Sequence, residues 1–316
     1  MPPRRASGYL TAADGCRLFW RGWFPVPPVR GQAVLVHGAN EHSGRYEHVA
    51  AWLVGLGFEV RALDLRGHGR SAGLRGHVDR FEQYLEDLER LVESRESKAG
   101  GAGGPGGGPG ILLIGHSMGG LIAFAYAAWR PERVGALVVS APWFGLRMRL
   151  SALDRLLAPV GARLVPRLRR PAGIEPGHLS RDPRVARAYR DDPLVGTTVT
   201  ARWFVECSRT AARARTQLAG QMRVPVLFLQ GDADRIVDPG TTRAVFEAVP
   251  HPCKALRRYP EGYHELFNDL DQGRVLADVE AWLERLGLWP AAAQPRDAPS
   301  TGAGLTGATP ASAPPA

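Results

Sequence analysis

The 316-residue sequence has no hydrophobic run long enough to cross a bilayer, few cysteines and almost no lysine. A membrane-spanning helix needs about 20 predominantly apolar residues in succession, and no stretch of the chain reaches that length. Residues 1–5 are basic but no apolar signal core follows them, so the sequence predicts a cytoplasmic protein. The scattered Cys16, Cys207 and Cys253 fit neither a disulfide framework nor a metal site.

Positive charge comes almost entirely from arginine, because Lys98 and Lys254 are the only lysines and the net charge is +9. A coding bias toward arginine and alanine explains this composition without any binding partner. A nucleic-acid partner is not predicted, since no recognisable binding module accompanies the charge. An anionic membrane surface is the preferred alternative as a partner for this charge, because the arginines concentrate in the middle of the chain.

Short apolar strands alternate with amphipathic helices along most of the chain. Strands are predicted at residues 9–11, 16–24, 33–36, 59–63, 111–114, 136–140, 226–230 and 255–259. Helices are predicted at residues 46–56, 81–94, 121–129, 241–249 and 276–286. This alternation predicts an α/β fold with a mostly parallel central sheet and helices on both of its faces.

Composition divides the chain into a core interrupted by an insertion. The first part of the core is predicted at residues 1–142 and the second at 223–289, with a helical cap between them at 143–222 that holds no clear strand. Residues 290–316 are rich in alanine, proline, glycine, serine and threonine, which predicts a disordered tail. The nearly all-glycine stretch 99–110 predicts a flexible surface loop.

The central feature of the sequence is a serine between two glycines, at the junction of a strand and a helix. Gly115-His116-Ser117-Met118-Gly119 matches G-x-S-x-G in the setting that a nucleophile elbow requires. The two glycines give room to a sharp turn that a larger side chain would obstruct. The start of the following helix adds backbone N–H groups and the positive end of its dipole. Ser117 is therefore the predicted nucleophile.

A serine hydroxyl needs a base to take its proton, and the base needs an acid to orient it. In hydrolases built on this elbow the chain order is serine, acid, histidine. Asp234 follows the predicted strand at 226–230, and His264 follows the one at 255–259. Both are expected at carboxyl ends of strands, where open α/β sheets hold their sites.

Each of these assignments has competitors. Asp232 and Asp238 compete with Asp234 for the role of the acid, and each acid could instead serve only a turn or a helix cap. His264 is preferred because it alone follows the final strand in the expected order. The other histidines, interpreted mostly as structural or solvent-facing, are His37, His42, His48, His68, His77, His116, His178 and His251.

An oxyanion hole needs two N–H donors aimed at the same point. The backbone of Met118, the residue after the nucleophile, is the first candidate. The second should come from the loop after an early strand, which is here His37-Gly38-Ala39-Asn40, and Ala39 is the predicted donor. A plain glycine turn is the alternative interpretation of this loop.

Together these segments resemble the monoacylglycerol lipase and lysophospholipase family of α/β-hydrolases. The resemblance covers roughly residues 8–288 and is specific in the core, weak across the cap. It implies a cofactor-free serine esterase with a Ser117–His264–Asp234 triad, an Ala39 and Met118 oxyanion hole, and a cap that admits an acyl chain. The segments that carry it, besides those of Asp234 and His264, are HGANEHSGRY at 37–46, DLRGHGRS at 64–71, GHSMGG at 115–120 and SAP at 140–142.

The predicted substrate is therefore a monoacylglycerol, cleaved to a fatty acid and glycerol through an acyl-enzyme. A lysophospholipase, a thioesterase or another carboxylesterase with the same triad is the alternative, and a non-catalytic binding protein on a hydrolase scaffold is a further one. The glycine-rich stretch 99–110 and the many arginines of the cap depart from the family pattern. The preferred acyl length, the head group and the oligomeric state stay open.

The first part of the predicted cap mixes apolar residues with arginines. Between Trp143 and Arg170 seven arginines face a single acid, Asp154. The spacing of Leu150, Leu153, Leu157 and Val160 predicts one helix face. That face either packs on the core as in an ordinary lid, or lies in the headgroup layer of an anionic membrane as an interfacial helix.

Overall fold

The computed structural model describes residues 4–96, 110–148 and 152–289, and it is built on an eight-stranded sheet with the order β1-β2-β4-β3-β5-β6-β9-β10. The strands β1 and β2 pair antiparallel, as do β2 and β4, whereas all the other neighbours pair parallel. The predicted mostly parallel α/β fold is thereby confirmed. The strands are β1 Arg4–Thr11, β2 Arg17–Phe24, β3 Gly31–Val36, β4 Phe58–Leu63, β5 Ile111–His116, β6 Val134–Ser140, β9 Val226–Gly231 and β10 Lys254–Tyr259.

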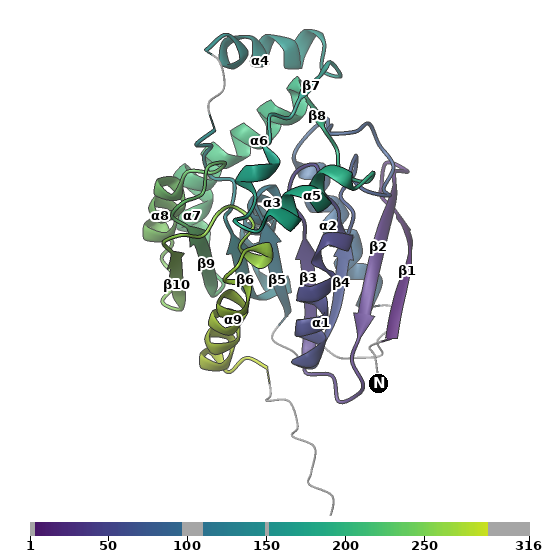
Figure 1. Cartoon of the computed structure of the whole chain (residues 1–316). Coiled ribbons are helices and arrows are strands. Elements are labelled where there is room, and N and C mark those ends of the chain that lie inside the picture. The colour runs from purple at the N-terminus through teal and green to yellow at the C-terminus, as the bar shows by residue number, and fades with distance from the viewer. Residues whose placement is uncertain (1–3, 97–109, 149–151, 290–316) are drawn as a thin grey trace, which may run out of the picture.

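Helices cover both faces of this sheet (Figure 1). On one face α1 and α9 share a core with Ala33 and Leu35 of β3, and on the other α2, α3 and α8 share a core with Val34 and Val36. Successive side chains of a strand point to opposite faces, so a continuous apolar strand fills two cores at once. The helices are α1 Glu47–Gly55, α2 Glu82–Glu96, α3 Met118–Trp129, α8 Pro239–Ala248 and α9 Gln272–Leu286.

The segment between β6 and β9, here called the cap segment (residues 143–222), lies over the carboxyl end of the parallel strands (Figure 1). Its helices are α4 Ala152–Leu164, α5 Pro183–Asp191, α6 Ala201–Arg213 and α7 Ala219–Gln221, with a π-helical turn at Ala214–Leu218. Figure 1 shows α4 farthest from the sheet, and it contacts α6. None of the described helices is both long and apolar enough to span a bilayer.

The expectation that the cap segment holds no strand is wrong. Two strands of three residues each, β7 Arg169–Pro171 and β8 Thr198–Thr200, pair antiparallel within it. They are too short and too polar to show an alternation of apolar and polar residues in the sequence. Each forms a strand only because it pairs with the other. The limits of the cap at residues 143 and 222 stay a prediction, and the predicted tail and most of the glycine-rich loop lie outside the described residues.

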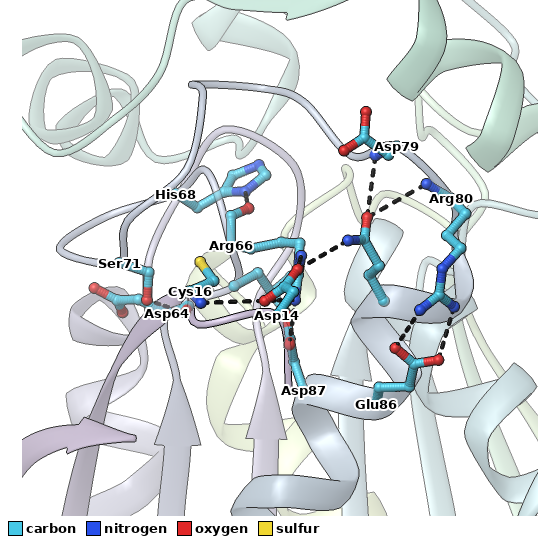
Figure 2. A network of polar contacts seen from close by, with 12 residues as sticks. Asp14, Cys16, Asp64, Arg66, His68, Ser71, Asp79, Arg80, Glu86 and Asp87 are labelled. Atoms are coloured by element: carbon cyan, nitrogen blue, oxygen red, sulfur yellow. Dashed lines mark hydrogen bonds and ion pairs between the residues drawn. The ribbon is translucent and has the colours of Figure 1, made fainter. Parts of the chain in front are cut away.

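The loop after β4 is fixed by charged side chains from three parts of the chain (Figure 2). Arg66 donates through Nε and Nη2 to both carboxylate oxygens of Asp87, each 2.6 Å away, and through Nη1 to Asp14 at 2.6 Å. The residue before Arg66 in the loop is oriented as well, because Leu65 N donates to His37 Nε2 at 2.9 Å. Arg66, held by Asp87 and Asp14, thus supports His37, the first residue of the loop after β3.

Candidate active site

The site lies where the order of the sheet reverses. The chain leaves β3 toward β4 on one side, and β5 returns to pair with β3 on the other. In open α/β sheets such a switch point leaves a crevice at the carboxyl ends of the two strands. The loop with Ala39 follows β3 and the turn with Ser117 follows β5, so the topology brings these two segments together.

The turn from β5 into α3 is sharp and strained. Ser117 has φ 53° and ψ −117°, a left-handed backbone that L-residues adopt at a cost. A Cβ on Gly119 would lie 2.2 Å from the backbone oxygen of Val36, and one on Gly115 would lie 2.3 Å from Gly119 O. Only glycine fits at both positions, because backbone atoms rather than movable side chains fill the space.

The structure brings the three predicted catalytic side chains into one chain of hydrogen-bond contacts. His264 Nε2 lies 2.9 Å from Ser117 Oγ, and His264 Nδ1 lies 2.8 Å from Asp234 Oδ2. The other oxygen of Asp234 accepts from Ile236 N at 2.8 Å and from Val237 N at 3.0 Å, which fixes the carboxylate. Asp234 and His264 are buried, so bulk water does not compete for these contacts.

The surroundings of His264 favour its charged form. Burial disfavours a charged ring, but the carboxylates of Asp234, Glu265 and Glu41 together outweigh this effect and raise the pKa of His264. The ring of His116 packs against that of His264 with centroids 4.7 Å apart. Burial, followed by the neighbouring His264, lowers the pKa of His116 to about 4, so at neutral pH it stays uncharged.

The competing acids have other partners. Asp232 pairs with Arg258 at 2.9 Å, and Asp238 is the N-cap of α8, accepting from Gly240 N at 2.9 Å. Other histidines have partners of their own: His48 Nε2 lies 2.8 Å from Phe267 O, and His68 Nδ1 lies 2.9 Å from Arg66 O. Among the histidines of the described part of the chain, only His264 lies within hydrogen-bond distance of Ser117 Oγ.

The two predicted oxyanion donors come from the turn of Ser117 and from the loop after β3, which line the same cavity. Met118 begins α3, where the first amides have no partner within the helix, and Ala39 lies in the loop after β3. Within the described ranges neither of these amides donates a hydrogen bond. Asn40 follows with φ 60°, which turns the chain directly after Ala39. Both amides are thus available to a substrate oxygen.

A cavity of about 590 Å³ opens in front of Ser117 and extends under the cap segment. Its floor comes from the loops after β3, β5 and β10, and its walls come from the cap segment. Most of the lining is apolar, and the apolar side chains that form it include Trp143, Leu146, Met148, Leu157, Val160, Leu179, Trp203 and Ile236. Such a cavity accepts an apolar chain with one polar end at Ser117.

Comparison with known proteins places this geometry in a family. A family profile described as serine aminopeptidase, S33, matches residues 27–271. The chain belongs to this family of α/β-hydrolases. A monoacylglycerol lipase of Mycolicibacterium smegmatis is 34% identical over 280 residues, covering 88% of this chain and 97% of the relative. A phospholipase of Bacillus subtilis (strain 168) is 29% identical over 269 residues, covering 84% of this chain and 98% of that one.

A solved structure has the same architecture. The crystal structure of a monoacylglycerol lipase from Paleococcus ferrophilus superposes with a TM-score of 0.75 at 31% identity, covering 90% of this chain and all of that one. The predicted α/β-hydrolase fold and the predicted resemblance are both confirmed. The chain is a carboxylic ester hydrolase.

Several polar residues of this hydrolase's site escaped the prediction from sequence. Glu41, Arg45 and Glu265 form a buried ionic group beside the cavity, and two of them line it. The signal was present, because Glu41 and Arg45 lie within the segment that carries the resemblance and Glu265 is next to His264. The sequence places both loops at the site, through Ala39 and His264, but it does not indicate that these three side chains pair with one another.

Proposed function

We propose that this hydrolase cleaves monoacylglycerols to a fatty acid and glycerol, through an acyl-enzyme on Ser117. The observation that carries the proposal is the Ser117–His264–Asp234 contact chain at one end of a largely apolar cavity of about 590 Å³. An acyl chain occupies the apolar part, which places the ester carbonyl at Ser117. The relatives named monoacylglycerol lipase support this choice of substrate.

In the proposed reaction His264 Nε2 takes the proton of the Ser117 hydroxyl as its oxygen attacks the ester carbonyl. The amides of Ala39 and Met118 donate to the oxyanion that forms, and Asp234 stabilises the imidazolium through Nδ1. His264 then gives its proton to the departing alcohol oxygen. A water molecule, deprotonated by His264, attacks the acyl-enzyme and releases the fatty acid, which restores the serine.

A panel of monoacylglycerols, lysophospholipids and p-nitrophenyl esters of matched chain length tests the substrate. We expect the largest kcat/KM for monoacylglycerols and loss of nearly all turnover in Ser117→Ala, because a hydrolase without its nucleophile keeps only residual catalysis. If Ser117→Ala keeps more than about a tenth of the activity, Ser117 is not the nucleophile. Higher kcat/KM for lysophospholipids would favour the second candidate, for which the B. subtilis phospholipase is the support.

The cap segment provides a surface that suits contact with a lipid bilayer. Leu157, Val160, Leu164, Val165 and Leu168 are each about half-exposed or more, with Leu164 at 74%. Exposed arginines lie among them in the sequence, at 163, 167, 169 and 170. An apolar helix face flanked by arginines binds at the headgroup boundary and is attracted to anionic lipid. We infer that the cap segment contacts anionic membranes peripherally, with Leu150 and the side chain of Leu153 outside the described residues.

A further inference from the structure

A buried ionic bridge joins the loop that carries Ala39 to the loop that carries His264. Arg45 Nη1 donates to Glu41 Oε2 at 2.7 Å, and Arg45 Nη1 and Nη2 donate to the two oxygens of Glu265, each at 2.7 Å. We call these three residues the Glu41–Arg45–Glu265 bridge. Both carboxylates are almost fully buried, and one arginine faces two acids.

The pKa values of Glu265 and of Tyr46, which contacts Glu41, depend on the neighbouring groups. Burial alone would raise the pKa of Glu265, but the Arg45 guanidinium outweighs this and lowers it. Burial, followed by the neighbouring Glu41, raises the pKa of Tyr46, so its hydroxyl stays protonated and donates to Glu41 Oε1 at 2.7 Å. One guanidinium pairs with two carboxyl groups, so the bridge holds one acidic group more than basic groups in a buried region.

Each end of the bridge touches the backbone next to a reacting group. Glu41 Oε1 accepts from Gly38 N at 2.6 Å, and the residue after Gly38 is Ala39. Glu265 is the residue after His264, and its own amide donates to Leu179 O of the cap segment at 2.7 Å. A shift of the bridge therefore moves an oxyanion donor and the catalytic base relative to each other.

We propose that Glu41 is a positioning residue of the hydrolytic reaction, holding the loop of Ala39 against the loop of His264 and adding a negative charge that favours the imidazolium. The proposal rests on the function proposed above, since it needs Ser117 as the nucleophile and His264 as its base. Misplacement of an active-site group by a fraction of an ångström is enough to slow a preorganised reaction.

Several groups face His264 and set its titration. Asp234 contacts its Nδ1, the uncharged His116 packs on its ring, and Arg147 donates to the backbone oxygen of Asp234 at 2.8 Å. The carboxylates of Glu265 and Glu41 act from the bridge, partly offset by Arg45. Removing the charge of Glu41 alone lowers the pKa of His264, because a nearby negative charge stabilises the imidazolium.

Glu41→Gln removes this charge and keeps an oxygen that can accept from Gly38 N. Its amide donors then face the donors of Arg45, which loosens the link between the two loops. We expect kcat to fall by about tenfold with KM within about twofold, since only the reacting geometry is disturbed. The acid limb of the kcat profile should move down by about half a pH unit.

Glu89→Gln is the matched control. Glu89 is also buried, accepts from the hydroxyl of Tyr126 and pairs with Arg133 at 3.5 Å. It lies on α2 and does not line the cavity, and Tyr126 is about 12 Å along α3 from Met118. This variant should lose stability without any change in the pH profile.

Glu41→Asp separates the two contributions. It keeps the charge but shortens the side chain, so kcat should fall while the acid limb stays near that of the native enzyme. Turnover is expressed per site titrated with a fluorophosphonate probe, so that an unfolded fraction does not enter kcat. The pH at half-maximal rate is likewise independent of the folded fraction.

The results separate the two proposals. A native kcat and a native pH profile in Glu41→Gln, with Ser117 still labelled by the probe, would overturn the positioning role alone. The positioning role would also be overturned if Glu41→Gln lowered kcat without shifting the acid limb, and Glu89→Gln lowered kcat to the same extent. Failure of the probe to label Ser117 in the native enzyme would instead overturn the proposed function.

Discussion

At the scale of single residues, three aspartates close together in sequence have different environments. Asp234 alone contacts His264, so Asp234→Asn should lower kcat by about 10⁴-fold, because the amide favours the wrong tautomer of the imidazole. Steady-state kinetics on the preferred ester measures this loss. Fluorophosphonate labelling should slow in parallel, since it uses the same activated serine.

Asp232→Asn and Asp238→Asn are the controls for this loss. The first weakens a partly exposed pair with Arg258, worth about 1 kcal/mol or less, and the second leaves the N-cap of α8 nearly intact, since asparagine caps a helix about as well as aspartate. Both should keep native kcat per labelled site. A loss of kcat at Asp232 together with an active Asp234→Asn would transfer the role of the acid.

The pH dependence follows from the raised pKa of His264. The ring must be neutral to accept the proton of Ser117, so activity is present above this pKa and is lost as the pH falls through it. Because Asp234 and the other carboxylates raise the pKa against the effect of burial, the acid limb should lie above about 6.5, the value of a free histidine. A kcat/KM profile that stays flat down to about pH 4.5 would rule out a histidine base.

Sequence predicted those site residues that carry a strict local pattern. Ser117 is marked by its glycines, and Asp234 and His264 by their places after apolar strands. Glu41, Arg45 and Glu265 could not be paired in this way, because Arg45 and Glu265 lie 220 positions apart and their contact depends on the packing of two loops. A buried ionic bridge has no periodicity that a sequence could reveal.

At the scale of elements, the close approach of α3 to β3 decides whether the elbow forms. In Gly119→Ala the new Cβ would lie 2.2 Å from Val36 O and 2.4 Å from His37 O, both backbone atoms. We expect a loss of about 1–3 kcal/mol in the free energy of unfolding, together with a marked loss of kcat, since the displaced strand end leads to Ala39. Urea denaturation and kinetics measure the two effects.

Gly55→Ala is the control for this substitution. Gly55 ends α1, and a Cβ there would meet nothing within 4 Å. Because alanine is the better helix former, this variant should be as stable as the native protein or more so, by up to about 1 kcal/mol. Equal destabilisation by both substitutions would mean that crowding of the elbow is not the cause.

The helices and strands of the core were predictable because their apolar patterns are strong. Exposed strands, which are held mainly by pairing with a neighbouring strand, were not predictable. The strand β1 begins at Arg4 rather than at Tyr9, since its first residues are held by pairing with β2 and alternate little in polarity. The short strands β7 and β8 depend on each other in the same way. Partner strands rather than local propensity define such elements.

At the scale of the whole molecule, the charge and exposure of the cap segment predict a salt-dependent contact with membranes. Sedimentation at low salt should show binding to anionic vesicles and little to neutral ones. High salt should weaken this binding, because electrostatic attraction is screened. Changing Arg167, Arg169 and Arg170 together to Glu should abolish it, since the sign of the local charge reverses.

A triple variant on α5, with Arg184, Arg187 and Arg190 changed to Glu, changes the net charge equally at a different place in the cap segment. Binding should survive this change if the surface around α4 makes the contact. Equal loss in both triple variants would assign the effect to net charge. Absence of binding to either vesicle type at low salt would leave the cap segment a lid without a role at the membrane.

The spacing of the proposed catalytic residues along the chain has a consequence for the order in which the site forms. Ser117 and His264 are 147 positions apart, and the sheet that unites them pairs strands from both halves of the chain. Parallel pairing of distant strands is slow, whereas single helices form within about a microsecond. The proposed triad is therefore complete only once β9 and β10 have joined the sheet, and we expect activity to appear at that step.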